Sequence, residues 1–253
     1  MPDDVKVKSL QKSMSVLECF TSRTPELGIT QISEMLGLSK SNVHNIVSTF
    51  EKLGYIEQNP VTGKYSLGLK MLEYSYVINE SLGYQRNLYQ ILRSICQKTQ
   101  HVVFFAIPKK EKIIYISAVY PEQTVYHFPT RSITGETAPM YCTSIGKAIL
   151  AFMKPEEAEP FICQPKMRFT ENTITDETAL RRELELTRSR GYSVDDREHE
   201  LEVKCVGVPV FDTKGVLVAG VSVSGAAISF TPDKIEEYAK ILQEAAYQMR
   251  DRL

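Results

Sequence analysis

The feature that most constrains this chain is a glycine that separates two short helical patterns between residues 29 and 53. Thr30 can cap the first helix, and Gly37 is expected to form the turn in a left-handed conformation, which glycine adopts at little steric cost. Ser39 can cap the second helix, which is predicted over Lys40 to about Leu53. The side chains expected to face inward are Ile32, Met35, Leu36, Val43, Ile46, Val47 and Phe50. Two helices joined in this way form a helix-turn-helix.

The flanking segments extend this motif to a winged helix-turn-helix. A helix is predicted over Val7–Phe20, and two short strands, Tyr55–Glu57 and Lys64–Leu67, enclose a turn that would form the wing. The outer face of the 40–53 helix carries small polar groups, which suits contact with base edges in a major groove better than the Glu/Lys pairs of a solvated face would. The residues expected to contact double-stranded DNA are Lys40, Ser41, Asn42, His44, Asn45, Ser48 and Lys64. The alternatives are a three-helix packing unit with a solvated polar face, or a module that binds protein.

Amino-acid composition limits the class of protein to which this chain can belong. The 253 residues are 43% hydrophobic and 24% charged, as in ordinary globular proteins, and the length suits two domains or one large one. The charged N-terminus leaves no apolar run for a signal peptide, and no apolar stretch approaches the ~20 residues of a membrane span. Five widely spaced cysteines without a CxxC motif indicate reduced thiols, and we expect a cytoplasmic protein. Residues 1–70 carry eight Lys and Arg against seven Asp and Glu, so DNA binding would depend on where the charges lie.

The rest of the chain mixes helices and strands in an order that favours an antiparallel sheet with helices on its faces. The fold class is therefore α+β, with a winged helix-turn-helix over residues 1–67, a helical linker over 68–82 and a larger α/β domain over 83–253. Helical stretches are expected over Leu67–Asn79, Leu82–Lys98, Ser144–Phe152, Pro155–Ile162, Asp176–Arg190 and from Thr231-Pro232 to Arg252. Strands are expected over Val102–Ile107, Lys112–Tyr120, near Thr124–Pro129, and over Tyr192–Asp195, Val203–Phe211 and Val216–Ser224.

Several motifs, in this order and spacing, closely resemble the IclR-type family of bacterial transcriptional regulators. They are Leu36-Gly37-Leu38-Ser39-Lys40-Ser41, Leu53-Gly54-Tyr55-Ile56, Gly63-Lys64-Tyr65-Ser66-Leu67-Gly68, Gly146-Lys147-Ala148-Ile149-Leu150-Ala151, Val206-Gly207-Val208-Pro209-Val210-Phe211-Asp212 and Gly220-Val221-Ser222-Val223-Ser224-Gly225. The resemblance implies a GAF-like effector-binding domain, a dimer or dimer of dimers, and a promoter-bound repressor, less often an activator, of a catabolic operon. It implies a small organic-acid effector, such as a keto-, sugar- or aromatic acid, and neither a cofactor nor a resident metal. Asn45 stands where the family often has Arg, and Met140-Tyr141-Cys142 where it often has Leu-His-Ala.

The Val216–Ser224 strand suggests where an effector would bind. Its valines alternate with Ser222 and Ser224, so both hydroxyls share the face opposite the core, unless that face is simply solvated. On the neighbouring strand, Cys205 is a weak donor and Gly207 is expected to leave room for a ligand. The resemblance implies effector positions at Asp195, Cys205, Ser222 and Ser224, and more loosely at Ser144 and Ile145, where a helix start suits an anion. These motifs offer no Arg or Lys expected to be buried, so hydroxyls and backbone N–H groups would hold the carboxylate.

Other groups of ionisable residues have simpler explanations than a metal site or a catalytic site. The acidic run over residues 195–202 could hold a metal, but a solvated loop is the more ordinary form of such a run. His101 and His127 lie beside predicted strands and suit packing or capping. An enzyme fused to a winged helix is the second class considered, with Cys205 as its nucleophile, but no motif places a base beside that thiol. We therefore expect a protein that is not an enzyme.

Overall fold

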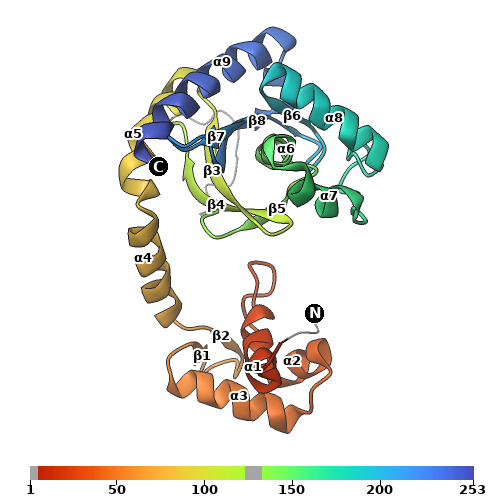
Figure 1. Cartoon of the computed structure of the whole chain (residues 1–253). Coiled ribbons are helices and arrows are strands. Elements are labelled where there is room, and N and C mark those ends of the chain that lie inside the picture. Colours follow the sequence, from red (N-terminus) through yellow and green to blue (C-terminus); the bar gives the residue numbers. More distant parts are fainter. Residues whose placement is uncertain (1–4, 123–132) are drawn as a thin grey trace. The chain divides into compact units, whose positions relative to one another are not determined.

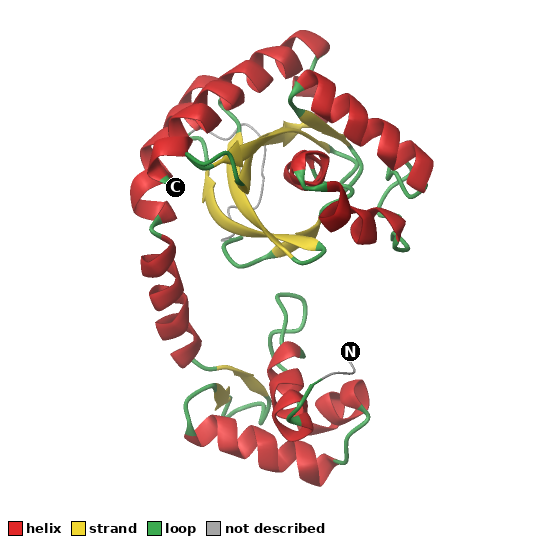
Figure 2. Ribbon diagram, in the orientation of Figure 1, coloured by secondary structure: helices red, strands yellow, loops and turns green. Residues whose placement is uncertain are grey.

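The computed structural model describes residues 5–122 and 133–253. The chain divides into two compact units, Met1–Leu82 and Gly83–Leu253, each described by itself below (Figures 1 and 2). The strand expected near Thr124–Pro129, and His127 with it, lie outside the described residues.

The first unit is a winged helix-turn-helix around a small apolar core. Its elements are α1 (Lys8–Glu18), α2 (Ile29–Leu36), α3 (Lys40–Lys52), β1 (Ile56–Gln58), β2 (Tyr65–Leu67) and α4 (Lys70–Leu82). The strands β1 and β2 pair antiparallel, and Leu27 adds an isolated bridge to Tyr65. Val16, Ile32, Val43 and Ile56 are fully buried, so all three N-terminal helices and the wing contribute to one core. The predicted winged helix-turn-helix is confirmed.

Two details of the α2 region differ from the prediction. The residue before α2 is Gly28, whose N–H donates to the Gln31 side chain (2.9 Å), so Thr30 lies inside the helix and does not cap it. Met35 is exposed because Ile32 and Leu36 already fill the inward positions of this eight-residue helix. Gly37 adopts the expected left-handed conformation, with φ of 64°.

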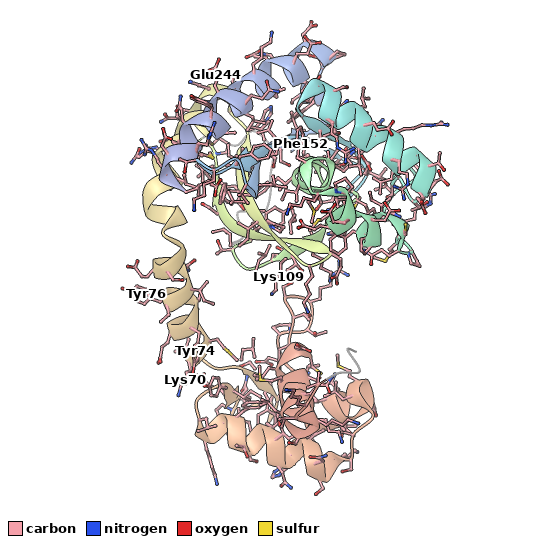
Figure 3. The ribbon with its side chains drawn as sticks, viewed as in Figure 1. Lys70, Tyr74, Tyr76, Lys109, Phe152 and Glu244 are labelled. Carbon is pink, nitrogen blue, oxygen red and sulfur yellow. The ribbon has the colours of Figure 1, made fainter. Side chains whose placement is uncertain are left out.

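The helix α4 begins against the wing. The rings of Tyr55 and Tyr74 stack with centroids 5.9 Å apart, and their hydroxyls share a hydrogen bond of 2.6 Å. The ammonium group of Lys70 lies 5.1 Å from the Tyr55 ring centroid. Figure 3 labels Lys70 and Tyr74 at the lower end of α4, and Tyr76 further along it. These contacts fix the start of α4 on the winged helix-turn-helix.

The second unit contains a curled antiparallel sheet in the order β5-β4-β3-β8-β7-β6. The strands are β3 (Val102–Lys109), β4 (Lys112–Val119), β5 (Thr137–Pro139), β6 (Ser193–Asp196), β7 (Val203–Phe211) and β8 (Leu217–Ala226). The helices are α5 (Tyr84–Thr99), α6 (Ser144–Phe152), α7 (Pro155–Cys163), α8 (Glu177–Arg190) and α9 (Pro232–Met249), with short 3-10 turns at Ala227–Ser229 and Arg250–Arg252. The predicted α+β class and antiparallel sheet are confirmed.

The two faces of the sheet are covered differently. Figure 1 shows α6 inside the curl of the sheet, with α5 and α9 outside it. On β7 and β8 the paired valines, such as Val206 with Val223, are fully buried. The alternate positions face α6, and α6 packs so closely that a Cβ added to Gly207 would lie 2.7 Å from the carbonyl carbon of Ser144. Gly207 is therefore required for the approach of α6, and the space expected there for a ligand is filled by helix backbone.

Candidate functional site

The outer face of α3 carries the side chains expected to contact DNA. Ser39 accepts a hydrogen bond from the N–H of Asn42 and so caps the helix. Val43 and Val47 are fully buried, which fixes the opposite face towards solvent. Of the candidate residues on α3, Lys40, Ser41, Asn42, His44 and Asn45 are exposed, and Ser48 is half-buried. The structure thus brings these six side chains to one accessible helix face.

The turn of the wing presents the seventh of these residues. The side-chain oxygen of Asn59 accepts hydrogen bonds from the N–H groups of Val61 and Thr62, and the backbone N–H of Asn59 donates to the carbonyl of Lys64. This closed turn holds Lys64 at an exposed position beside β2. An ordered wing with an exposed ammonium group can contact a phosphate.

The six residues expected to bind an effector surround one cavity of about 160 Å³ in the second unit. Ser144 and Ile145 come from the first turn of α6, Asp195 from β6, and the remaining three from β7 and β8. The thiol of Cys205 lies 3.0 Å from the hydroxyl of Ser224. The other lining residues are Phe104, Tyr115, Tyr120, Ile133, Glu136, Thr137, Ala138, Thr143, His199, Glu200, Val203. Ser222 and Ser224 are buried, so the alternative of a solvated serine face is wrong.

The N-terminus of α6 forms one wall of this cavity. Thr143 caps the helix: its hydroxyl oxygen accepts from the N–H of Gly146 (3.2 Å), while the hydroxyl donates to the carbonyl of Pro139 (2.8 Å). The first turn of a helix exposes N–H groups that have no partner within the helix, and these favour negative charge. Ser144 and Ile145 lie in that turn, so the wall suits a carboxylate.

The electrostatics of the cavity are dominated by burial. Burial raises the pKa of Asp195 to about 7, although Lys147 and the backbone N–H of Glu198 act in the opposite direction. Burial also raises the pKa of the Cys205 thiol, which stays neutral, and lowers that of His199. Among the described lining residues, the groups that can carry charge are Asp195, Glu136, Glu200 and His199, with no Lys or Arg. The ionisable side chains of the described lining are thus mostly acidic.

Two expectations about charge were wrong. Lys147, in the Gly146-Lys147 motif, is fully buried, yet it faces away from the cavity towards Glu183 and Glu198. The run over residues 195–202 is not simply a solvated loop, because Asp195 and Glu198 are buried within it. Both errors arise from partners distant in sequence, since Lys147 and Glu198 are 51 positions apart.

Aromatic lining residues were missed by the sequence analysis. Phe104 and Tyr115 come from adjacent strands, and their ring centroids lie 5.4 Å apart. The alternation of side chains along β3 could have predicted that Phe104 lies on the face opposite the core. Its position beside Ser222 follows only from the pairing of β3 with β8. His101 packs on Phe230 and Tyr238, as expected of a packing residue.

A winged helix-turn-helix joined to an α/β domain with a curled sheet defines a class of DNA-binding transcriptional regulators. The family model described as "Bacterial transcriptional regulator IclR C-terminal" matches residues 81–250, and that described as "IclR helix-turn-helix domain" matches residues 9–60. The chain therefore belongs to the IclR family of transcriptional regulators. Its relatives are regulators and not enzymes, in agreement with the prediction that this chain is not an enzyme.

Individual relatives cover nearly the whole chain. The HTH-type transcriptional regulator KdgR of Escherichia coli (strain K12) is 32% identical, over 97% of this chain and 91% of that protein. The structure of the Thermotoga maritima IclR is 33% identical, with a TM-score of 0.73 over 97% of this chain and 98% of that one. An IclR homolog complexed with 4-hydroxybenzoate, from Microbacterium hydrocarbonoxydans, shares the fold at 22% identity, with a TM-score of 0.81 over 96% and 97% of the two chains. Among the described residues of the present chain, no helix combines the length and apolar character needed to cross a membrane.

Proposed function

We propose that this chain is a repressor of a catabolic operon whose affinity for operator DNA changes when a small organic acid binds in the cavity of the second unit. The observation that carries the proposal is the convergence of Asp195, Cys205, Ser222 and Ser224 with the first turn of α6 on one cavity. Hydroxyls, a thiol and a helix N-terminus together can bind a carboxylate without a cationic side chain.

The charges around the cavity narrow the class of effector. No Lys or Arg lies among the described lining residues, and Asp195, Glu136 and Glu200 would repel a second negative charge. A monocarboxylate therefore suits the cavity better than a dicarboxylate or a phosphate ester. The volume of about 160 Å³ favours a compact acid. Asp195 can pair with a hydroxyl or a hydrated carbonyl of the ligand, which favours hydroxy- and keto-acids over plain fatty acids.

An aromatic monocarboxylate is a further candidate. Phe104 and Tyr115 supply ring faces to the cavity wall, and a structural relative at 22% identity is described as complexed with 4-hydroxybenzoate. A phenol oxygen would need a polar partner at the end opposite the carboxylate, and Asp195 or His199 offers one. Keto-, sugar- and aromatic acids are all in the first set to test.

Calorimetry of the full-length protein against pyruvate, D-gluconate and 4-hydroxybenzoate tests the site. We expect one of these acids to bind, and the Ser222→Ala/Ser224→Ala variant to bind it at least about tenfold more weakly, because two hydrogen bonds to a charged group are lost. Ser189→Ala, at an exposed serine of α8, is the matched control. Equal affinity in the wild type and the double variant would show that the site is misplaced.

DNA recognition is proposed to lie on α3 and the wing. Asn42, Asn45 and Ser48 would read base edges in the major groove, while Lys40 and Lys64 would contact phosphates. We expect Asn42→Ala and Asn45→Ala to change the order of preference among operator variants in a gel shift. Asn79→Ala, on α4, is the control that should leave this order unchanged. If the order is the same in all three variants, α3 is not the reading helix.

Operator binding would involve at least a symmetric dimer, because two winged helices can meet two half-sites. Two of the helical stretches expected from the sequence, Leu67–Asn79 and Leu82–Lys98, are candidates for the dimer interface. The apolar face of the second stretch packs inside its own unit, since Leu88 and Leu92 are buried there. On α4, by contrast, Leu72, Tyr76 and Val77 are all more than 60% exposed. We therefore propose α4 as the interface helix.

A further inference from the structure

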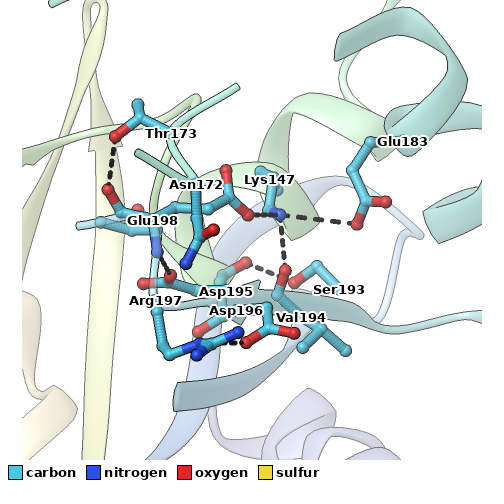
Figure 4. A network of polar contacts seen from close by, with 12 residues as sticks. Lys147, Asn172, Thr173, Glu183, Ser193, Val194, Asp195, Asp196, Arg197 and Glu198 are labelled. Carbon is cyan, nitrogen blue, oxygen red and sulfur yellow. Dashed lines mark hydrogen bonds and ion pairs between the residues drawn. The ribbon is translucent and has the colours of Figure 1, made fainter. Parts of the chain in front are cut away.

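A fully buried lysine lies behind the cavity at the centre of a polar network. The ammonium group of Lys147 donates to the carbonyl of Val194 and to the carboxylate of Glu198, and lies 3.5 Å from the carboxylate of Glu183. Figure 4 shows these three partners arranged around the lysine. Glu183 is itself paired with Arg190 at 2.8 Å. Burying an ammonium group is costly without such partners, so the network must be nearly complete for the native state to form.

The network joins two walls of the cavity without lining it. Lys147 lies on α6, three residues after Ser144 and two after Ile145. Glu198 stands in the loop that follows β6, and its N–H donates to the carboxylate of Asp195 (2.8 Å). The same loop contributes His199 and Glu200 to the lining. The loop after β6 binds Asp195 through the N–H of Glu198. The ion pair of Lys147 and Glu198 thus connects this loop to α6, whose first turn lines the cavity.

The far side of the loop is held by two hydroxyls. Thr173 donates to the carbonyl of Glu198 at 2.7 Å, and Thr170 donates to the carbonyl of Arg197 at 2.6 Å. The backbone of the loop is therefore fixed from one side, while the side chain of Glu198 is fixed from the other. The carboxylate of Glu198 is buried, and its ion pair with Lys147 and a backbone hydrogen bond from Ile174 both favour its ionised form.

We propose that Lys147 and Glu198 are positioning residues that fix the place and the charge of Asp195 in the effector cavity without contacting the effector. This inference rests on the function proposed above. Its physical basis is that the two members of the pair act on Asp195 with opposite sign: the ammonium group favours the ionised form of Asp195, and the carboxylate of Glu198 favours the protonated form.

Apart from this pair, the backbone N–H groups of Glu198 and His199 favour the ionised form of Asp195. Tyr115 from β4, Cys142 before α6 and Cys205 from β7 have pKa values raised by burial, so they stay neutral over the physiological range. His199 lies in the loop that follows β6, and burial lowers its pKa. The acidic groups that line the same cavity are Glu136 and Glu200. Neither belongs to the network around Lys147.

The test compares Lys147→Met with Glu198→Gln in the full-length protein. In the wild type, affinity for a monocarboxylate should fall as pH rises through the pKa of Asp195, because ionised Asp195 repels the ligand. Lys147→Met should move the midpoint of that fall upwards by about one pH unit or more, and Glu198→Gln should move it downwards. The probe is whichever of pyruvate, D-gluconate and 4-hydroxybenzoate binds the wild type.

A merely structural role gives a different pattern. If both variants weaken binding at every pH and leave the midpoint in place, or move it in the same direction, the proposal is overturned. Should Lys147→Met not fold, Lys147→Met/Glu198→Met replaces the pair by apolar groups of similar size, which proteins often tolerate. In that variant the midpoint should lie between those of the two single variants, and a midpoint outside this range counts against the pair.

A readout without ligand separates this inference from the proposed function. The carboxyl carbon of Asp195, identified by its loss in Asp195→Asn, is titrated by NMR in the wild type and both single variants. Midpoints displaced in opposite directions support the inference even if no acid binds, in which case the proposed effector class fails alone. Identical midpoints overturn the inference whatever the calorimetry shows.

Discussion

Replacing Gly207 by alanine tests how α6 is seated against the sheet. The new Cβ would lie 2.7 Å from the carbonyl carbon of Ser144 and 2.9 Å from the nitrogen of Ile145. Carbon contacts are comfortable from about 3.5 Å, so the first turn of α6 must withdraw by roughly 0.6–0.8 Å. Since both contacts are with backbone, no side-chain rotation relieves them. Overpacking of this kind costs about 1–3 kcal/mol of unfolding free energy.

The same displacement reaches the cavity, because Ser144 and Ile145 form its wall. We expect Gly207→Ala to lower affinity for the bound acid by about tenfold or more, as hydrogen-bond geometry to the helix start is lost. Urea unfolding measures the stability, and calorimetry with the acid that binds the wild type measures the affinity.

Val208→Ala is the matched control. Val208 is the next residue on β7, is almost fully buried, and lines the opposite side of the strand near α9. Its truncation should cost about 1–3 kcal/mol through a cavity in the core, while leaving α6 in place. If the two variants lose similar stability and bind the acid equally well, α6 does not position the ligand and the reasoning is refuted.

Three further predictions follow from charge and exposure. Because the pKa of Asp195 is raised to about 7 in the folded chain, the native state holds a proton that the unfolded state releases near pH 4. The unfolding free energy should therefore fall as pH rises from about 4 to 7. In urea titrations the unfolding free energy of Asp195→Asn should rise relative to that of the wild type over this window, and a constant difference would contradict the raised pKa. Lys64→Ala should weaken binding to all DNA sequences alike and reduce the slope of log affinity against log salt concentration by about one. Fluorescence anisotropy measures both, and an unchanged slope would show that Lys64 does not contact a phosphate. Leu72→Glu/Tyr76→Glu should dissociate the dimer in sedimentation experiments, whereas Leu186→Glu, at an exposed position of α8, should leave it intact. If the α4 variant still forms a dimer, the interface lies elsewhere.

Most of the features that could be predicted from the sequence depend on neighbours along the chain. Gly37 and Ser39 act within one turn of the helices that they bound, so their conformation and capping could be predicted from spacing. The alternation of Ser222 and Ser224 with core valines likewise follows from the period of a strand. The error at α2 is also local: Gly28 and Gln31 supply the cap that Thr30 was expected to supply.

What the sequence could not predict depends on pairs that are far apart. Lys147 resembles any helical lysine until Glu198 is brought beside it. Gly207 suggests free space until the backbone of Ser144 is found to occupy it. A single sequence carries no information on which residue fills such a gap. The candidate effector residues could therefore be named, whereas the network that supports them could not.

The most direct test of the account is the response of DNA binding to the effector. Fluorescence anisotropy would follow the protein on DNA from upstream of its own gene while the acid that binds in calorimetry is added. We expect the acid to change the operator affinity of the wild type, and Ser222→Ala/Ser224→Ala to bind the same DNA normally but respond only at higher concentration, because binding at the two sites is reciprocally linked. An acid that shifts the wild type and this variant at the same concentration, or shifts neither, would contradict the central claim.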